Sequence, residues 1–452
     1  MSEYEKAGKP KFQIDTSEER PADRALVIVP ILGPQAVSGA EQSTLHQRSE
    51  ASRLEEAVGL ARAIDLDIVH SGTVQLSKLR PSTLFGSGKV DEFKGTVKAL
   101  DIGLVIVDHP LTPVQQRNLE KEWNAKVIDR TGLILEIFGA RAQTKEGRLQ
   151  VELAHLNYQK GRLVRSWTHL ERQRGGLGTV GGPGETQIEA DRRQLQERIN
   201  KLEKELEKVR RTRNLHRSKR KKVPHPIVAL VGYTNAGKST LFNHVTGSQV
   251  LAKDMLFATL DPTLRRLYLP NGTLVILSDT VGFVSDLPTH LVAAFRATLE
   301  EVIEADLILH VRDIADPDTR AQADDVYAIL EQLGIKDEGR EGVVEVWNKI
   351  DLIDSETLDA IRQTRETVTD APVLVSALTG QGIDEMLSLV EQKIAGSEGV
   401  VEFDLPIEKM GNLNWIYENA HVIERSDMDD GSLHMRVRVT PIMKEQLLAK
   451  VA

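Results

Sequence analysis

Gly232-Tyr233-Thr234-Asn235-Ala236-Gly237-Lys238-Ser239 has the spacing of a phosphate-binding loop, GxxxxGKS. The apolar residues 227–231 before it predict a buried strand, and residues 239–243 after it predict the start of a helix. Backbone N–H groups of such a turn surround a β-phosphate, and the helix presents its positive end to the same group. We therefore expect an α/β nucleotide-binding domain, with Lys238 against the β- and γ-phosphates and Ser239 as a ligand of Mg²⁺.

A second motif, Asp279-Thr280-Val281-Gly282, follows the apolar run 274–277. This order places the carboxylate of Asp279 at a strand end beside the loop, where it can hold Mg²⁺ through a water molecule. Gly282 can donate its N–H to the γ-phosphate and so report whether that phosphate is present. We expect Lys238 and Gly282 to take part in catalysis.

Two further motifs select the base. Asn348-Lys349-Ile350-Asp351 comes first, and Ser376-Ala377-Leu378 follows it. The carboxylate of Asp351 can accept from both N1–H and the exocyclic amine of guanine, whereas adenine offers no such pair of donors. We expect Asn348 to reach the other edge of the base, the stem of Lys349 to cover it, and the Ser376-Ala377 backbone to bind its carbonyl. Together the four motifs predict a switch that binds GTP and GDP.

Phe283 follows Gly282, at the position where Ras-type enzymes carry the glutamine that orients the attacking water. A phenylalanine cannot hydrogen-bond that water, so we expect slow unassisted hydrolysis, on the order of 10⁻⁴–10⁻² s⁻¹. Asn235 has two interpretations. It helps to recruit K⁺ beside the phosphates, or it is a loop asparagine that caps its own backbone.

The first switch is predicted in the segment Phe257-Ala258-Thr259-Leu260-Asp261-Pro262-Thr263. A threonine hydroxyl from this segment would complete the shell of Mg²⁺. Thr259 and Thr263 both qualify by chemistry, and their spacing from Lys238 does not choose between them.

The length of 452 residues is too great for a single core, so we expect two to four domains. The chain has no cysteine, which excludes disulfides, thiolate metal sites and a cysteine nucleophile, and is typical of a reducing cytoplasm. No stretch approaches the ~20 apolar residues of a membrane span. We expect a cytoplasmic protein, and a monomer.

The charge is unevenly distributed. The net charge is −9, yet residues 141–222 contain 22 Lys and Arg against 10 Asp and Glu. This basic segment favours contact with nucleic-acid phosphates, although the average composition does not.

The order of patterns along the chain predicts an α/β multidomain fold with five parts: a disordered tail (1–24), a small parallel α/β domain (25–130), an antiparallel helical hairpin (131–222), a Ras-like P-loop G domain (226–396) and a small α+β domain (399–452). In the second part, expected strands at 25–32, 68–70, 104–107 and 127–128 alternate with expected helices at 54–63, 90–100 and 113–123. In the last part, apolar stretches at 400–405 and 435–439 flank a helix-like middle.

The hairpin prediction rests on two helices with a glycine-rich connection at 174–184. One helix is expected from 132 to about 170 and the other from about 186. The second helix carries an apolar seam of heptad type, formed by Ile188, Leu195, Ile199, Leu202, Leu206 and Val209. The partner of this seam is either the first helix, which the chain itself supplies, or a second copy of the chain.

Several segments closely resemble the HflX family of ribosome-associated GTPases. They are 130–142, 146–156, the Gly182-Pro183-Gly184-Glu185 segment through Arg193, 86–93, 257–263 and 279–283. The resemblance covers about residues 25–395. It implies nucleotide contacts by all residues of the motifs above, with Phe257 to Asp261 as the first switch, and it favours Thr259 over Thr263 as the Mg²⁺ ligand and catalytic threonine.

The resemblance also implies a partner, the large ribosomal subunit and its RNA, and a role in splitting stalled ribosomes, rescue, translation or biogenesis. We expect RNA rather than DNA as the nucleic acid. The candidate RNA contacts are Arg172, Arg174, Gly175, Gly176, Gly178, Arg192 and Arg193. The basic run 210–222 is a further candidate for contact with the RNA backbone. The alternatives are that the glycine-rich segment is a disordered surface connection and that the run 210–222 is a solvated helix end.

Two functional hypotheses of different class follow. In the first, the GTP-bound protein docks on the large subunit, which stimulates hydrolysis. In the second, the chain is an RNA-binding assembly or remodelling factor in which nucleotide hydrolysis is secondary. A membrane or signalling GTPase is disfavoured because no lipidation signal or amphipathic anchor is found.

Overall fold

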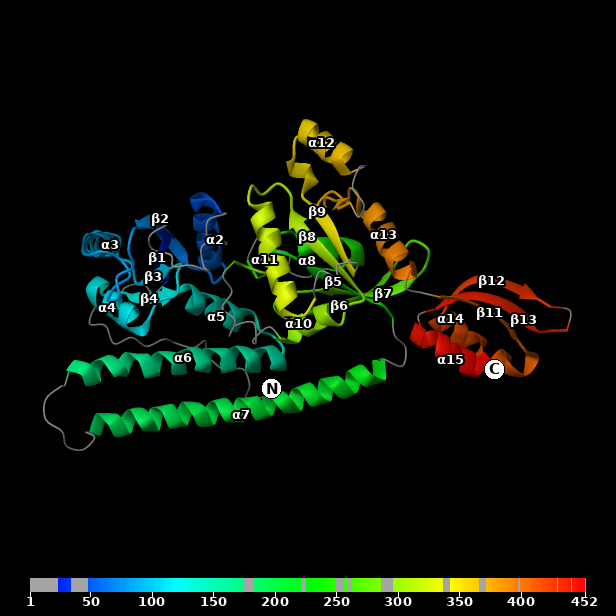
Figure 1. Cartoon of the computed structure of the whole chain (residues 1–452), viewed down its shortest axis with the longest axis horizontal. Coiled ribbons are helices and arrows are strands. Elements are labelled where there is room, and N and C mark those ends of the chain that lie inside the picture. Colours follow the sequence, from blue (N-terminus) through cyan, green and yellow to red (C-terminus); the bar gives the residue numbers. More distant parts are fainter. Residues whose placement is uncertain are drawn as a thin grey trace, which may run out of the picture. The chain divides into compact units, whose positions relative to one another are not determined.

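Figure 1 shows the computed structural model of the chain, which describes residues 23–33, 48–173, 183–220, 225–248, 256–257, 260, 262–285, 296–335, 342–365, 371–396, 399–428, 430–439 and 441–451. Two compact units are present, Met1–Ile137 with Tyr158–Arg193 and Phe138–Asn157 with Gln194–Ala452. The predicted α/β multidomain fold class is confirmed. Within the described ranges, the helices lack the combination of length and apolar character needed to cross a bilayer.

The first sheet has the strand order β2-β1-β3-β4, and all its strands are parallel, as the alternation of patterns predicted. Its elements are β1 (Arg24–Leu32), α2 (Glu50–Arg62), β2 (Asp67–Leu76), α3 (Ser87–Ala99), β3 (Leu104–Val107), α4 (Pro113–Trp123) and β4 (Lys126–Asp129). Strand β2 is longer than the expected 68–70. It lies at the sheet edge, so polar residues such as Ser71, Thr73 and Gln75 interrupt its apolar pattern.

Asp129 connects this sheet to the following helices. One carboxylate oxygen accepts from the backbone N–H of Gly132 at 2.8 Å and from the Tyr158 hydroxyl at 2.6 Å. The other accepts from the backbone N–H of Leu111 at 3.1 Å and from Arg162 at 2.5 Å. Burial raises the pKa of Tyr158 well above its usual range, so its hydroxyl keeps the proton that it donates. The buried carboxylate is thus satisfied on both oxygens.

The helix expected from 132 to about 170 is in fact two helices, α5 (Arg130–Arg141) and α6 (Lys145–Gln173). Thr144 accounts for the interruption, because its hydroxyl accepts from the backbone N–H of Gly147 at 2.9 Å and caps the start of α6. The sequence Thr144-Lys145-Glu146-Gly147 carries this signal, which the helical periodicity on either side obscured.

Helix α7 (Pro183–Arg220) begins three residues before the expected start, with a proline in its first position. The apolar seam from Leu195 to Val209 packs against Leu149, Leu153 and Leu156 of α6. Arg198 also pairs with Glu152 across the two helices at 2.6 Å. The partner of the seam is therefore α6 of the same chain, in an antiparallel pair (Figure 1).

The G domain contains a six-stranded sheet of order β10-β9-β8-β5-β7-β6, in which only the β6–β7 pair is antiparallel. Its strands are β5 (Ile227–Val231), β6 (Thr263–Tyr268), β7 (Leu274–Asp279), β8 (Leu307–Asp313), β9 (Val343–Asn348) and β10 (Val373–Leu374). Its helices are α8 (Lys238–Thr246), α10 (Arg296–Ile303), α11 (Thr319–Gln332), α12 (Ser355–Arg365) and α13 (Ile383–Gly396), with a 3₁₀ turn η5 (Ile350–Leu352). The carboxyl ends of β5, β7, β9 and β10 share one edge, which brings the four motifs together.

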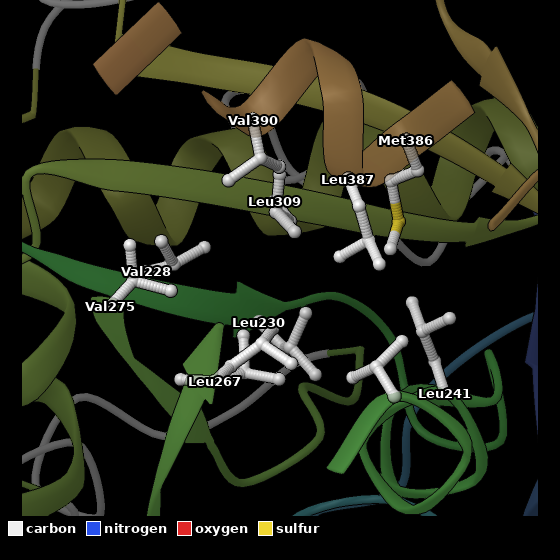
Figure 2. A pocket seen from close by; sticks show the side chains of 11 residues that line it. Val228, Leu230, Leu241, Leu267, Val275, Leu309, Met386, Leu387 and Val390 are labelled. Carbon is white, nitrogen blue, oxygen red and sulfur yellow. The ribbon is translucent and has the colours of Figure 1, made fainter. Parts of the chain in front are cut away.

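A small cavity of about 10 Å³ lies inside this domain, and Figure 2 shows the side chains that line it. Side chains of β5, β7 and β8 meet Leu241 of α8 and Met386 and Val390 of α13 around it. Every lining residue is apolar, so the cavity offers no hydrogen bond to a ligand. It is a packing gap in the core of the domain.

The last part of the chain is a three-stranded antiparallel sheet of order β11-β13-β12 with helices on one face (Figure 1). Its elements are β11 (Gly399–Leu405), η6 (Ile407–Asn412), α14 (Leu413–Asn419), β12 (His421–Asp427), β13 (Leu433–Val439) and α15 (Pro441–Val451). The expected α+β character is present. Strand β12 was missed because its residues are mostly polar and exposed, as suits an edge strand.

Candidate functional site

The loop between β5 and α8 has the backbone geometry of a phosphate cradle. Gly237 has a φ of +92°, and a Cβ at this position would lie 2.2 Å from the side-chain nitrogen of Asn348, so only glycine fits. Asn235 is exposed and has a φ of +61°, a conformation that asparagine tolerates better than most residues. The conformation of the loop thus depends on a glycine at 237, beside Asn348, and on the left-handed backbone of Asn235.

Lys238 is buried at the first position of α8. Its ammonium group donates to the carbonyl of Gly232 at 3.0 Å and to that of Tyr233 at 2.7 Å. Burial lowers the pKa of Lys238 to about 8, although the charge of nearby Asp279 opposes the shift. The ammonium therefore lies inside the loop, where phosphate oxygens can replace the two carbonyls.

Ser239 and Asp279 lie next to each other. The serine hydroxyl donates to one carboxylate oxygen of Asp279 at 2.8 Å, and Asp279 is fully buried at the end of β7. Hydroxyl and carboxylate oxygens are ligands that Mg²⁺ prefers, so this pair fits the predicted metal position. Thr259, the other predicted ligand, lies outside the described residues, as do Ala258 and Asp261.

Gly282 lies directly against the loop. A Cβ on Gly282 would be 2.9 Å from the Cα of Thr234 and 3.1 Å from the Lys238 nitrogen. The two residues before it face inward: the Thr280 hydroxyl donates to the carbonyl of Leu230 at 2.6 Å, and Val281 is buried. Gly282 thus offers backbone, and no side chain, to the place where the loop and Lys238 meet.

Phe283 is only 3% exposed, and its backbone pairs with the phosphate-binding loop. The N–H of Phe283 donates to the carbonyl of Gly232 at 3.1 Å, and the N–H of Thr234 donates to the carbonyl of Phe283 at 2.7 Å. The aromatic ring is therefore packed in the protein.

Of the predicted nucleotide contacts Phe257 to Asp261, the structure describes Phe257 and Leu260, both buried, while the alternative ligand Thr263 begins β6. Phe257 has a φ of +56°, unusual for a bulky residue, and its ring meets that of Phe138 edge-on with centroids 5.0 Å apart. The ring of Phe257 thus packs against Phe138 of α5.

The base-selecting motifs come together at the ends of β9 and β10. Asn348 donates to the carbonyl of Ala236 at 2.8 Å and accepts from the N–H of Ala377 at 2.9 Å, so it braces the phosphate-binding loop against the Ser376-Ala377 turn. Asp351 accepts from the Ser376 hydroxyl at 2.5 Å, which orients its carboxylate. The structure therefore shows a bracing role for Asn348 that we had not predicted.

The remaining members of these motifs have distinct environments. Lys349 has a φ of +66° and pairs with Asp313 at 2.7 Å. Ile350 is buried in η5, whereas Leu378 is 76% exposed. Asp313 ends β8, the strand next to β9, and so lies near Lys349. The sequence does not indicate this pairing until the strand order is known.

The candidate RNA contacts are described in part. Arg192 and Arg193 are exposed on α7. Arg172 lies in α6, but the structure does not describe its side chain, and Arg174, Gly175, Gly176 and Gly178 lie outside the described residues.

Sequence models of four families match successive parts of the chain. Their descriptions are GTP-binding GTPase N-terminal (residues 51–139), GTP-binding GTPase Middle Region (141–220), 50S ribosome-binding GTPase (227–349) and HflX C-terminal domain (360–451).

Individual relatives show the same likeness. GTPase HflX of Magnetococcus marinus is 50% identical over 377 residues, which are 83% of this chain and 86% of that protein. GTPase HflX of Escherichia coli strain K12 is 42% identical over 405 residues, 89% and 93% of the two chains. The crystal structure of a GTP-binding protein from Sulfolobus solfataricus in complex with GDP aligns with a TM-score of 0.43 and 22% identity, covering 82% of this chain and 98% of that one.

Proposed function

The chain belongs to the HflX family of GTPases, and from this membership we propose that its GTP hydrolysis controls binding to the large ribosomal subunit. The GTP-bound protein docks on the large subunit, the ribosome stimulates hydrolysis, and the GDP-bound protein leaves. The family model that matches residues 227–349 is described as a 50S ribosome-binding GTPase, which supports a partner of this kind. In this proposal the protein acts in the cytoplasm, in ribosome splitting or rescue, in translation or in ribosome biogenesis.

The observation that carries the proposal is the position of Phe283. Its buried ring and its paired backbone leave it unable to orient a water molecule, so this enzyme lacks the usual help at that position. If a docking partner supplies the group that orients the attacking water, hydrolysis depends on that partner. The basic segment 141–222 gives the chain a means of finding an RNA surface.

The chemistry within the domain is electrostatic. Lys238 neutralises charge on the β- and γ-phosphates, and the Gly282 N–H donates to the γ-phosphate. Ser239, Thr259 and, through water, Asp279 hold Mg²⁺, which when bound neutralises charge that develops on the phosphates. The serine–carboxylate pair at 2.8 Å supports this assignment.

Base selection rests on Asp351. The Ser376 hydroxyl holds one of its oxygens, and the carboxylate accepts from two N–H donors of guanine. The Ala377 N–H already donates to Asn348, so a further backbone N–H of this turn binds the guanine carbonyl in our proposal.

The test is the rate of phosphate release from saturating GTP and Mg²⁺ at low salt, with large subunits, with small subunits and with neither. We expect at least about tenfold stimulation by large subunits alone, and loss of activity in Lys238→Ala. Equal rates in all three conditions contradict the proposal. The same assay in K⁺ and in Na⁺ tests the cation interpretation of Asn235, which predicts a faster rate in K⁺.

The exposed Arg192 and Arg193 also fit a second function, an RNA-binding assembly or remodelling factor in which hydrolysis is secondary. Lys238→Ala discriminates between the two. If the wild-type protein sediments with large subunits in a nucleotide-dependent way and this variant does not, the first function is supported. If the variant keeps its ribosome binding and its cellular function, the second is supported.

A further inference from the structure

The hydroxyl of Tyr233, in the second position of the phosphate-binding loop, contacts the segment that follows Gly282. The backbone N–H of Ser285 donates to this hydroxyl at 2.8 Å, and the tyrosine side chain is buried. A tyrosine here is compatible with the loop motif, whose second position is unrestricted, so the motif itself does not explain the contact.

This bond is the third connection between the same two segments. The other two are the backbone hydrogen bonds that join Phe283 to Gly232 and Thr234. Any sequence could form those two, since they involve no side chain. The third depends on a single hydroxyl, and it fixes the chain two residues beyond Phe283.

Gly282 lies between two anchors as a result. On one side, the Thr280 hydroxyl is bonded to the carbonyl of Leu230 at 2.6 Å. On the other side, the segment Phe283–Ser285 is bonded to the loop at its two ends. A backbone N–H held on both sides needs little reorganisation when charge develops on a phosphate, and this is the condition under which such a donor is most effective.

We propose that Tyr233 is a positioning residue, which aims the Gly282 N–H at the γ-phosphate. The proposal rests on the γ-phosphate contact of Gly282 and not on the ribosome. GDP has no γ-phosphate, so the hydroxyl affects GTP and the transition state while leaving GDP binding unchanged.

The test is Tyr233→Phe, which removes the hydroxyl and keeps the ring. We expect the Kd of a non-hydrolysable GTP analogue to rise about three- to tenfold and the kcat of intrinsic hydrolysis to fall by a similar factor, with the Kd of GDP within about twofold of wild type. Amide hydrogen exchange of the peptide containing Ser285 becomes faster in the GTP-analogue complex.

Tyr327→Phe is the matched control. The Tyr327 hydroxyl of α11 also donates a hydrogen bond of 2.8 Å, to Glu345 of β9, and neither residue belongs to the loop or to the segment 279–285. A general loss of stability from removing a tyrosine hydroxyl would appear in both variants. We expect the ratio of GTP-analogue to GDP affinity to change in Tyr233→Phe alone.

Equal weakening of GTP analogue and GDP in Tyr233→Phe, or no change in either, overturns the proposal. Gly282→Ala separates this result from failure of the underlying contact, because its methyl group would crowd Thr234 and Lys238. If Gly282→Ala loses affinity for the GTP analogue while Tyr233→Phe keeps it, only the role of the hydroxyl is contradicted. No loss in either variant sinks the γ-phosphate contact as well.

Discussion

At the scale of single residues, the G domain buries a histidine that the nucleotide site does not use. His310 of β8 is almost fully buried, and its ring meets Tyr327 edge-on at 4.9 Å. Burial lowers the pKa of His310 to about 4, although Glu345 opposes the shift. Its Nδ1 atom has no hydrogen-bond partner within the described part of the chain. The imidazole is therefore neutral in the folded protein at neutral pH.

This histidine predicts a pH dependence of stability. The pKa of His310 is 6.5 in the unfolded chain and about 4 in the folded protein. Between pH 4 and pH 6.5 the unfolded chain therefore binds an extra proton. Stability is then full above pH 6.5 and falls by about 3 kcal/mol as the pH drops to 4. Denaturant unfolding from pH 7 to 4.5, compared with His310→Leu, measures the difference. Parallel pH profiles for the two proteins contradict the prediction.

At the scale of elements, Asp129 shows how one side chain joins several of them. It lies at the end of β4, caps the start of α5, and holds α6 through Tyr158 and Arg162. The loop before α4 is held through the N–H of Leu111. Removing one member of a buried, fully bonded charge pair is costly, because the partner charge and the donors lose their acceptor.

We expect Asp129→Asn to destabilise the first unit by about 3 kcal/mol. Amide hydrogen exchange of peptides from β3, β4 and α5 measures this locally, since the chain has more than one unit and need not unfold in one step. Asp404→Asn is the control, because Asp404 is paired with His434 but largely exposed, and its loss costs about 1 kcal/mol at most. Unchanged exchange in Asp129→Asn would show that the cluster is not needed to hold these elements.

At the scale of the whole molecule, charge is separated along the chain. Residues 141–222 carry a surplus of basic side chains while the complete chain is acidic. The antiparallel pair of α6 and α7 buries its apolar seam internally and leaves Arg192 and Arg193 exposed. Such a chain can bind a polyanion through one part while the rest is repelled, which favours a single orientation of docking.

We expect Arg192→Glu with Arg193→Glu to weaken binding to large subunits by at least about tenfold at low salt, and to lower the salt dependence of binding by about two released counterions. Intrinsic GTP hydrolysis stays unchanged. The control carries the same charge change on α12, Arg362→Glu with Arg365→Glu. Equal weakening by both double variants would indicate a general charge effect and would contradict a specific contact on α7.

The sequence predicted the elements whose signals are local. The loop from Gly232 to Ser239 and the parallel sheet of residues 25–130 followed from spacing and alternation, and both fold predictions hold. The break at Thr144 and the edge strand β12 were missed, because a capping threonine between two helical patterns and a polar strand both have weak periodicity. The assignments of individual nucleotide and RNA contacts stay predictions.

By itself, the sequence predicted the chemistry of this protein: which residues would bind phosphate, metal and guanine, and that Phe283 cannot orient water. Only the tertiary structure decided how those residues hold one another. Asn348 braces two loops, and the Tyr233 hydroxyl fixes Ser285, across 112 and 52 positions of the chain. Residue type and spacing can be identified in a short stretch of sequence. A hydrogen bond between distant segments depends instead on which strand ends the sheet brings together.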